Sequence, residues 1–355
     1  MPRWRIYYLN NVISGAFNGG ILPMYQRRKR LSTDAYVEGV LAGDRIVLSK
    51  AITLVESTLE EDNRLAESVL ERLLPHTGNS IRIGITGVPG VGKSTFIEAF
   101  GQLLTSRQKK LAVLAVDPSS QRSKGSILGD KTRMQNLSID PLAYIRPSAS
   151  GSSLGGVSTK TRETMLLCEA AGYEVVFIET VGVGQSETTV HGMTDFFLLL
   201  MLAGAGDELQ GIKKGIMEMA DAVVITKADG DNLHPCERAA REYRNALHLF
   251  QPSESGWSPP VLTCSALEKT GLTDIWSEIE KYSTLLRANG QFECKRQEQH
   301  VQWMHDIIAH VLQQQFYSHD HIKGSVEDLE SLVRKGELAS ITAARQLLDA
   351  YLSGR

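Results

Sequence analysis

The feature that most constrains the fold is a glycine-rich loop between a short apolar run and a longer amphipathic stretch. The loop reads GVPGVGKS, from Gly87 to Ser94, and fits the pattern G-x-x-x-x-G-K-[ST]. The residues IRIGIT precede it as a strand would, and STFIEAFGQLL follows it as a helix would. In this context the loop predicts a phosphate cradle. Its backbone N–H groups converge on phosphate oxygens, Lys93 reaches the β- and γ-phosphates, and Ser94 offers a hydroxyl to Mg²⁺.

Short apolar runs alternate with amphipathic stretches through the middle of the chain. The runs are IRIGIT, KLAVLAVD, YEVVFIET, DFFLLLML, DAVVIT and PVLTCSA. Runs rich in Val, Ile and Leu, separated by helical stretches, are typical of buried parallel strands in βαβ units. We therefore expect an α/β fold, a P-loop NTPase with a mostly parallel central sheet flanked by helices, plus helical N- and C-terminal extensions.

The pattern predicts four segments. Residues 1–31 are expected to be a leader, either disordered or a mis-assigned start with Met24 as the true initiator, although a lack of acids is also typical of mitochondrial transit peptides. Residues 32–78 form a helical cap, with one helix over the apolar positions 37–55 and a second over 65–74. Residues 79–290 form the nucleotide-binding domain, and residues 291–355 form a C-terminal helical arm.

Charge and cysteine usage exclude several classes of function. The first 33 residues hold six basic residues and no acid, which leaves 32 basic against 41 acidic residues in the rest of the chain. That acidic balance argues against a nucleic-acid-binding body. No apolar run approaches the roughly 20 residues that span a bilayer, so no membrane segment is expected. The four cysteines are scattered singly, without the spacing of a zinc site.

Carboxylates at the ends of two of the predicted strands indicate a metal site. Glu179 follows the apolar residues of YEVVFIET and Asp117 ends KLAVLAVD, while Asp130 follows in GSILGDK. Ligands of open parallel sheets bind at the carboxyl ends of strands, and carboxylates suit Mg²⁺. The stretch E-T-V-G stands where many GTPases have D-x-x-G, so Glu179 is expected to face the metal and the γ-phosphate. Gly182 is expected to approach that phosphate with its N–H.

Two later loops predict recognition of guanine. The run AVVITKAD ends in T-K-A-D, which resembles the N-K-x-D motif: Asp229 would accept hydrogen bonds from the base, and the stem of Lys227 would lie along it. Thr226 replaces the usual Asn, which places the bracing between loops in doubt more than the choice of base. In VLTCSAL, the backbone of Ser265, Ala266 and Leu267 would meet the guanine oxygen.

Together these residues resemble one family, the methylmalonyl-CoA mutase-associated GTPases. The motifs that carry the resemblance are GVPGVGKST at 87–95, AVDPSS at 115–120, GSILGDKTRM at 125–134, IETVGVGQSE at 178–187 and DELQGIKKG at 207–215. The resemblance covers the chain from about Asp34 to the C-terminus. It implies a GTPase that uses GTP/GDP and Mg²⁺.

The expected site residues fall into three sets. The nucleotide is expected to bind Gly87, Val88, Pro89, Gly90, Val91, Gly92, Lys93, Ser94, Thr95, Gly182, Lys227, Asp229, Ser265, Ala266 and Leu267. The metal ligands are expected to be Ser94, Asp117, Asp130 and Glu179. The residues expected to act in catalysis are Lys93, Asp117, Glu179 and Lys213.

The resemblance also implies partners. They are adenosylcobalamin-dependent methylmalonyl-CoA mutase, whose cofactor loading GTP hydrolysis would gate, and a second copy of the chain joined through the C-terminal helices. Lys213, in DELQGIK, resembles the functional lysine of an additional switch. The expected location is the cytoplasm, or the mitochondrial matrix in a eukaryote.

Three alternatives remain open at this point. A metal-insertion GTPase would carry a Cys/His cluster near the nucleotide, but Cys168 has no Cys or His neighbour. A kinase of an amino-acid transport system would need contact with the periplasm, for which no signal segment is present. A non-catalytic nucleotide sensor is disfavoured by the intact Lys93, Ser94 and Glu179. Metal analysis and a turnover assay distinguish these alternatives.

Overall fold

The computed structural model describes residues 30–116, 134–147, 154–180, 186–204, 214–248 and 255–353. The chain divides into two units, Met1–Ser32 and Thr33–Arg355. All of the helices and strands named below belong to the second unit. In the described part of the chain, no helix is both long and apolar enough to cross a membrane.

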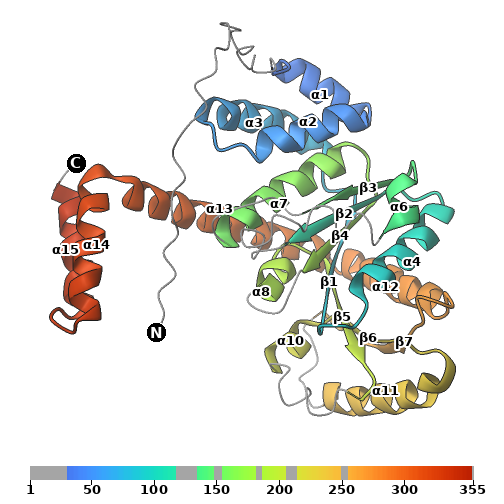
Figure 1. Cartoon of the computed structure of the whole chain (residues 1–355). Helices are drawn as coiled ribbons and strands as arrows, with labels where there is room; N and C mark the ends of the chain where they lie inside the picture. The colour runs from blue at the N-terminus through green and yellow to red at the C-terminus, as the bar shows by residue number, and fades with distance from the viewer. Residues whose placement is uncertain are drawn as a thin grey trace, which may run out of the picture. The chain divides into compact units, whose positions relative to one another are not determined.

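A parallel sheet forms the centre of the second unit (Figure 1). Within the described residues it has seven strands in the order β3-β2-β4-β1-β5-β6-β7, and every neighbouring pair is parallel. The strands are β1 Ile81–Gly87, β2 Leu111–Val116, β3 Ala143–Arg146, β4 Val175–Thr180, β5 Phe196–Leu202, β6 Ala222–Thr226 and β7 Val261–Thr263. The α/β fold predicted from the sequence is confirmed, and each of the six apolar runs contains one strand.

The strand β3 was missed by the sequence analysis. It consists of four residues, AYIR, and lies at the edge of the sheet, where it pairs with β2 alone. Its last two residues are only partly buried. A strand this short, with one neighbour and little apolar character, has no hydrophobic pattern that distinguishes it from a loop.

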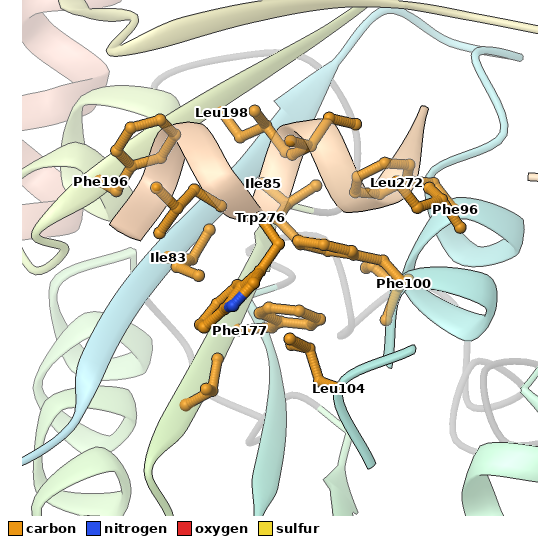
Figure 2. Packing of buried hydrophobic residues seen from close by; sticks show 14 of the residues in the cluster. Ile83, Ile85, Phe96, Phe100, Leu104, Phe177, Phe196, Leu198, Leu272 and Trp276 are labelled. Atoms are coloured by element: carbon orange, nitrogen blue, oxygen red, sulfur yellow. The ribbon is translucent and has the colours of Figure 1, made fainter. Parts of the chain in front are cut away.

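Helices cover both faces of the sheet. The helices α4 Lys93–Ser106 and α12 Leu272–Ala288 pack on one face, where Ile83, Ile85 and Phe177 point into a shared core with Phe100 and Trp276 (Figure 2). On the opposite face, Leu199 and Met201 of β5 and the alternate residues of β6 pack against α10 and α11. The helices on that side are α7 Leu154–Ala170, α8 Ser186–His191, α10 Lys214–Met219 and α11 Leu233–Leu247. Shorter elements are α6 Gln135–Ile139, η1 Leu74–His76 and η2 Gly230–Asn232.

Three helices precede the sheet, where the sequence analysis expected two. They are α1 Thr33–Leu41, α2 Arg45–Val55 and α3 Glu60–Leu73. The prediction of one helix over 37–55 was wrong because Gly43 adopts a left-handed conformation (φ 71°) and Asp44 begins a new helix. The Asp44 carboxylate accepts hydrogen bonds from the N–H groups of Ile46 and Val47, at 2.7 and 3.1 Å, as an N-cap does.

The chain ends in α13 Gln291–Ser318, α14 Asp320–Arg334 and α15 Ser340–Ser353. The first half of α13 is fastened to the sheet by side chains that donate to the segment between α8 and β5. Arg296 donates to both oxygens of the Asp195 carboxylate, at 2.7 and 2.6 Å, and Trp303 donates to the carbonyl of Gly192 at 3.0 Å. Beyond this anchor, α14 packs on α13 and on α15.

Candidate functional site

The phosphate loop joins β1 to α4, and at two of its positions the local geometry favours glycine over any other residue. A Cβ atom at Gly87 would lie 2.4 Å from the carbonyl oxygen of Leu200 in β5, so the strand end and its neighbour are in direct backbone contact. Gly92 lies at φ 89°, a left-handed conformation that suits glycine, immediately before α4 begins at Lys93. The loop therefore places the N-terminus of a helix at the carboxyl edge of the sheet, which is the geometry of an anion site.

Within the loop, Val91 is buried, whereas Pro89, Gly90 and Thr95 are exposed and Val88 is partly buried. The Lys93 ammonium group folds back over the loop and donates to the carbonyl of Gly87 at 2.9 Å. This contact holds the lysine across the concave side of the loop, where the phosphates of a nucleotide would lie.

Lys93 lies within electrostatic range of two carboxylates. Burial lowers the pKa of its ammonium group, and the negative charges of Glu179 and Glu187 act in the opposite direction. Both acids are buried, at 6% and 4% exposure. No role for Glu187 was predicted from the sequence, although it lies in the same stretch as Glu179. Its position in α8, eight residues after Glu179 and within electrostatic range of Lys93, depends on the tertiary fold.

Two of the described groups near this lysine are of the oxygen-donor type that Mg²⁺ prefers. Glu179 is the penultimate residue of β4, which pairs with β1, and Ser94 is the second residue of α4. Two carboxylates opposite one lysine leave a local negative charge that a hard cation such as Mg²⁺ would offset. Asp117, Asp130, Gly182 and Lys213 lie outside the described residues. Within the described residues, no group of three or more His, Cys, Asp or Glu side chains is arranged to hold a metal.

Beneath this edge, β1 and β4 are joined by their side chains as well as by their backbones. The Thr180 hydroxyl donates to the Thr86 hydroxyl at 2.9 Å, and both residues are buried. The bond fixes the two strand ends that carry the phosphate loop and Glu179. These two parts of the predicted site are therefore held next to one another before any ligand binds.

The two loops predicted to read guanine also meet. The Ser265 hydroxyl donates to the Asp229 carboxylate, and the N–H of Ala228 donates to the carbonyl of Cys264 at 3.0 Å. Ser265 is fully buried, while Leu267 is 77% exposed. A buried hydroxyl thus orients the carboxylate, and the backbone that follows turns outward, where a base could contact it.

Lys227 extends from the base loop to the phosphate loop. It adopts a left-handed backbone conformation (φ 59°), which is uncommon for a residue other than glycine. A methyl group added at Gly92 would lie 3.9 Å from Cε of Lys227, so the lysine stem passes over the end of the phosphate loop. The stem is available as one wall of a base-binding slot.

The assembled edge has the groups that binding and cleavage of a nucleoside triphosphate require. The phosphate loop would supply N–H donors and the charge of Lys93, the acids would supply ligands for a cation, and Asp229 would supply acceptors for the base. In phosphoryl transfer such positioning and charge stabilisation account for most of the rate acceleration.

Comparison with known proteins gives a consistent result. Residues 48–321 match the family model described as methylmalonyl Co-A mutase-associated GTPase MeaB. A putative GTPase of Caulobacter vibrioides is 52% identical, over 90% of this chain and 98% of that protein. The methylmalonic aciduria type A homolog of Mus musculus, a mitochondrial protein, is 46% identical over 90% of this chain and 80% of its own length. A solved structure described as a LAO/AO transport system kinase superposes with a TM-score of 0.72 and 40% identity, over 89% of this chain and 96% of that one.

Proposed function

The chain belongs to the methylmalonyl-CoA mutase-associated GTPase family, and on that basis we propose that its GTP hydrolysis controls the loading of adenosylcobalamin into methylmalonyl-CoA mutase. In this role the GTPase admits the active cofactor and keeps inactivated cofactor out of the enzyme. The observation that carries the proposal is that the phosphate loop, Glu179 and the two base loops lie at one edge of the sheet. The chain is also 46% identical to a mitochondrial methylmalonic aciduria type A homolog. The corresponding location is the cytoplasm, or the mitochondrial matrix if the source is eukaryotic.

We assign the steps of hydrolysis to this edge. The backbone of residues 87–95 and Lys93 hold the phosphates, and Gly182 donates to the γ-phosphate. Mg²⁺ would be held by Ser94, Asp117, Asp130 and Glu179. Asp229, Lys227 and the backbone of residues 265–267 hold guanine. The hydrogen bond from Ser265 to Asp229 supports the last assignment, since it joins the two loops that are predicted to contact the base.

Hydrolysis by the free protein is expected to be slow. The residue that follows E-T-V-G is Val183, which has no side-chain group to orient the attacking water. We propose that docking of the mutase brings Lys213 toward the nucleotide, where its charge stabilises the transition state. A lysine lacks the planar fork of an arginine finger, so the acceleration should be below the roughly 10³–10⁵ that such fingers give.

The arm formed by α13–α15 is proposed to join two copies of the chain. One face of α13 packs on the body through Phe292, Arg296 and Trp303. On the opposite face, apolar residues recur at helical spacing and are exposed: Val301 at 56%, Met304 at 51%, Ile308 at 48% and Val311 at 41%. An exposed apolar stripe of this length is typical of a surface that is covered in an assembly.

Light scattering on the purified protein tests the dimer. The double change Met304→Glu with Ile308→Glu should give a monomer because it places two charges in the proposed interface. Ile139→Glu is the matched control, since Ile139 is 81% exposed but lies on α6, outside the arm. A monomeric wild type at micromolar concentration would refute this assignment.

Single-turnover GTP hydrolysis, with and without purified methylmalonyl-CoA mutase, tests the proposed partner. The mutase should accelerate the wild type, and Lys213→Ala should lose most of that acceleration while still binding GTP. An equal acceleration in the variant would remove Lys213 from the mechanism. No acceleration of the wild type would reject the mutase as partner, and phosphate transfer to a transport protein would favour the kinase alternative.

A further inference from the structure

The residue that stands in place of the asparagine of N-K-x-D makes a hydrogen bond that could not be predicted from the sequence. Thr226 is the last residue of β6 and is 4% exposed. Its hydroxyl donates to the carbonyl of Val91, in the middle of the phosphate loop, at 2.9 Å. The carbonyl of Met201, in β5, lies 3.3 Å from the same hydroxyl. A hydroxyl has one proton, so the shorter and better hydrogen bond is the one to the phosphate loop.

This hydrogen bond is one of several that hold the start of the base loop. The side-chain amide of Asn232 donates to the carbonyl of Lys227 at 2.7 Å, and the thiol of Cys236 lies 3.6 Å from the carbonyl of Thr226. The N–H of Cys264 donates to Ile225 at 2.9 Å. The base loop is therefore ordered by its own neighbours. The hydrogen bond from the Thr226 hydroxyl extends from this loop to the phosphate loop.

The contact is also well placed to act on the nucleotide. Val91 is 1% exposed, and the residue that follows it, Gly92, precedes the lysine that would hold the phosphates. The residue after Thr226 is Lys227, whose stem passes over Gly92. The hydrogen bond thus joins the two loops at the point where the base and phosphate halves of a nucleotide site meet.

We propose that Thr226 is a positioning residue that couples the base loop to the phosphate loop, in place of the asparagine of N-K-x-D. The inference rests on the proposed guanine site. With the hydrogen bond present, the loops form one preorganised surface before nucleotide binds. Without it, the nucleotide must order each loop separately, and that ordering reduces affinity. The threonine at this position had placed the bracing between the two loops in doubt. In the structure, its hydroxyl instead makes a direct hydrogen bond to the phosphate loop.

The test compares three variants by titration of fluorescent GDP and GTP into the full chain. Thr226→Val keeps the shape of the side chain and removes the donor, and should weaken both nucleotides about tenfold. Thr226→Ser keeps the donor and should remain within about threefold of wild type. Thr105→Val is the control: it removes another buried hydroxyl, which donates to the carbonyl of Gln102 at 3.3 Å, away from both loops.

Two further readouts separate positioning from folding. The binding stoichiometry reports the folded fraction of each variant, and it should stay at the wild-type value. At saturating GTP, the single-turnover rate of Thr226→Val should match wild type, because the residue does not touch the reacting phosphate. Its preference for guanine over xanthine nucleotides should also be unchanged.

Asp229→Asn, measured in parallel, tests the guanine site itself and should favour xanthine nucleotides. If Asp229→Asn shifts base preference while Thr226→Val binds like wild type, the coupling by Thr226 is refuted and the guanine site stands. Equal losses in Thr226→Val and Thr226→Ser would also overturn the inference, since the hydroxyl would then be irrelevant. An unchanged base preference in Asp229→Asn would instead refute the guanine site on which the inference rests.

Discussion

Removal of the Arg296 side chain should destabilise the junction between the C-terminal arm and the sheet. Its guanidinium group donates to both carboxylate oxygens of Asp195, at 2.7 and 2.6 Å, and to the carbonyls of Gly78 and Ser80, at 2.6 and 2.7 Å. The side chains of Arg296 and Asp195 are 9% and 2% exposed. Arg296→Leu would leave a buried carboxylate without its counter-charge and two carbonyls without their donor.

The expected loss follows from this burial. Removing one partner of a buried ion pair costs roughly 3–5 kcal/mol. Asp195 keeps the backbone N–H of Arg82 as a donor at 2.8 Å, so the lower end of that range, about 3 kcal/mol, applies. The control is Arg334→Leu, in the exposed pair Arg334–Glu330 on α14, whose side chains are 79% and 55% exposed. An exposed i, i+4 pair contributes only about 0.3–0.5 kcal/mol.

Urea denaturation, followed by tryptophan fluorescence, measures both free energies of unfolding. Trp303 is a suitable reporter because it lies on α13 and donates to Gly192 at the same junction. Asp195→Asn in the Arg296→Leu background should recover part of the loss, since it removes the uncompensated charge. If Arg296→Leu lies within about 1 kcal/mol of the exposed control, the burial argument fails.

Three further changes test other parts of the structure. Burial lowers the pKa of His191 to about 4, so between about pH 6.5 and pH 4 the unfolded state binds a proton that the folded state does not. The free energy of unfolding should therefore decrease as the pH is lowered through this range, by up to about 1.4 kcal/mol per pH unit. Urea denaturation at pH 7 and pH 5 should show a smaller decrease in His191→Gln than in wild type. Gly87→Ala should abolish GDP binding in titration, because its Cβ would lie 2.4 Å from the carbonyl of Leu200, while Gly324→Ala, with open space around it, should bind normally. Phe100→Ala should cost about 3–5 kcal/mol in urea denaturation because the fully buried ring stacks on Phe177 and contacts Trp276. A loss below about 1 kcal/mol would contradict the packing in Figure 2.

Local patterns account for the parts of the fold that could be predicted. The strand, phosphate loop and helix from Ile81 to Ser106 are adjacent in sequence, and their chemistry is specified by the loop residues themselves. The apolar runs predicted the parallel sheet because buried strands need apolar residues on both faces. The break at Gly43 and Asp44 was also visible locally, as a glycine followed by an N-cap residue, and was overlooked.

The remaining features depend on which distant residues the fold brings together. Thr226 and Val91 are 135 positions apart, and Arg82 and Glu169, a buried pair at 2.7 Å, are 87 apart. The local sequence around these residues indicates neither contact, and the threonine in place of asparagine had placed the bracing between the loops in doubt.

The sequence by itself determined the phosphate loop, the strand-end acid Glu179 and the T-K-A-D motif, because each is a short pattern with a chemical requirement of its own. Only the tertiary structure decided that Glu187 lies near Lys93, that Thr226 spans to the phosphate loop and that Arg296 anchors the arm to Asp195. The reason is physical: a side chain's hydrogen-bond partner and charge environment are set by burial and by the packing of strands and helices. Periodicity along the chain carries no record of either.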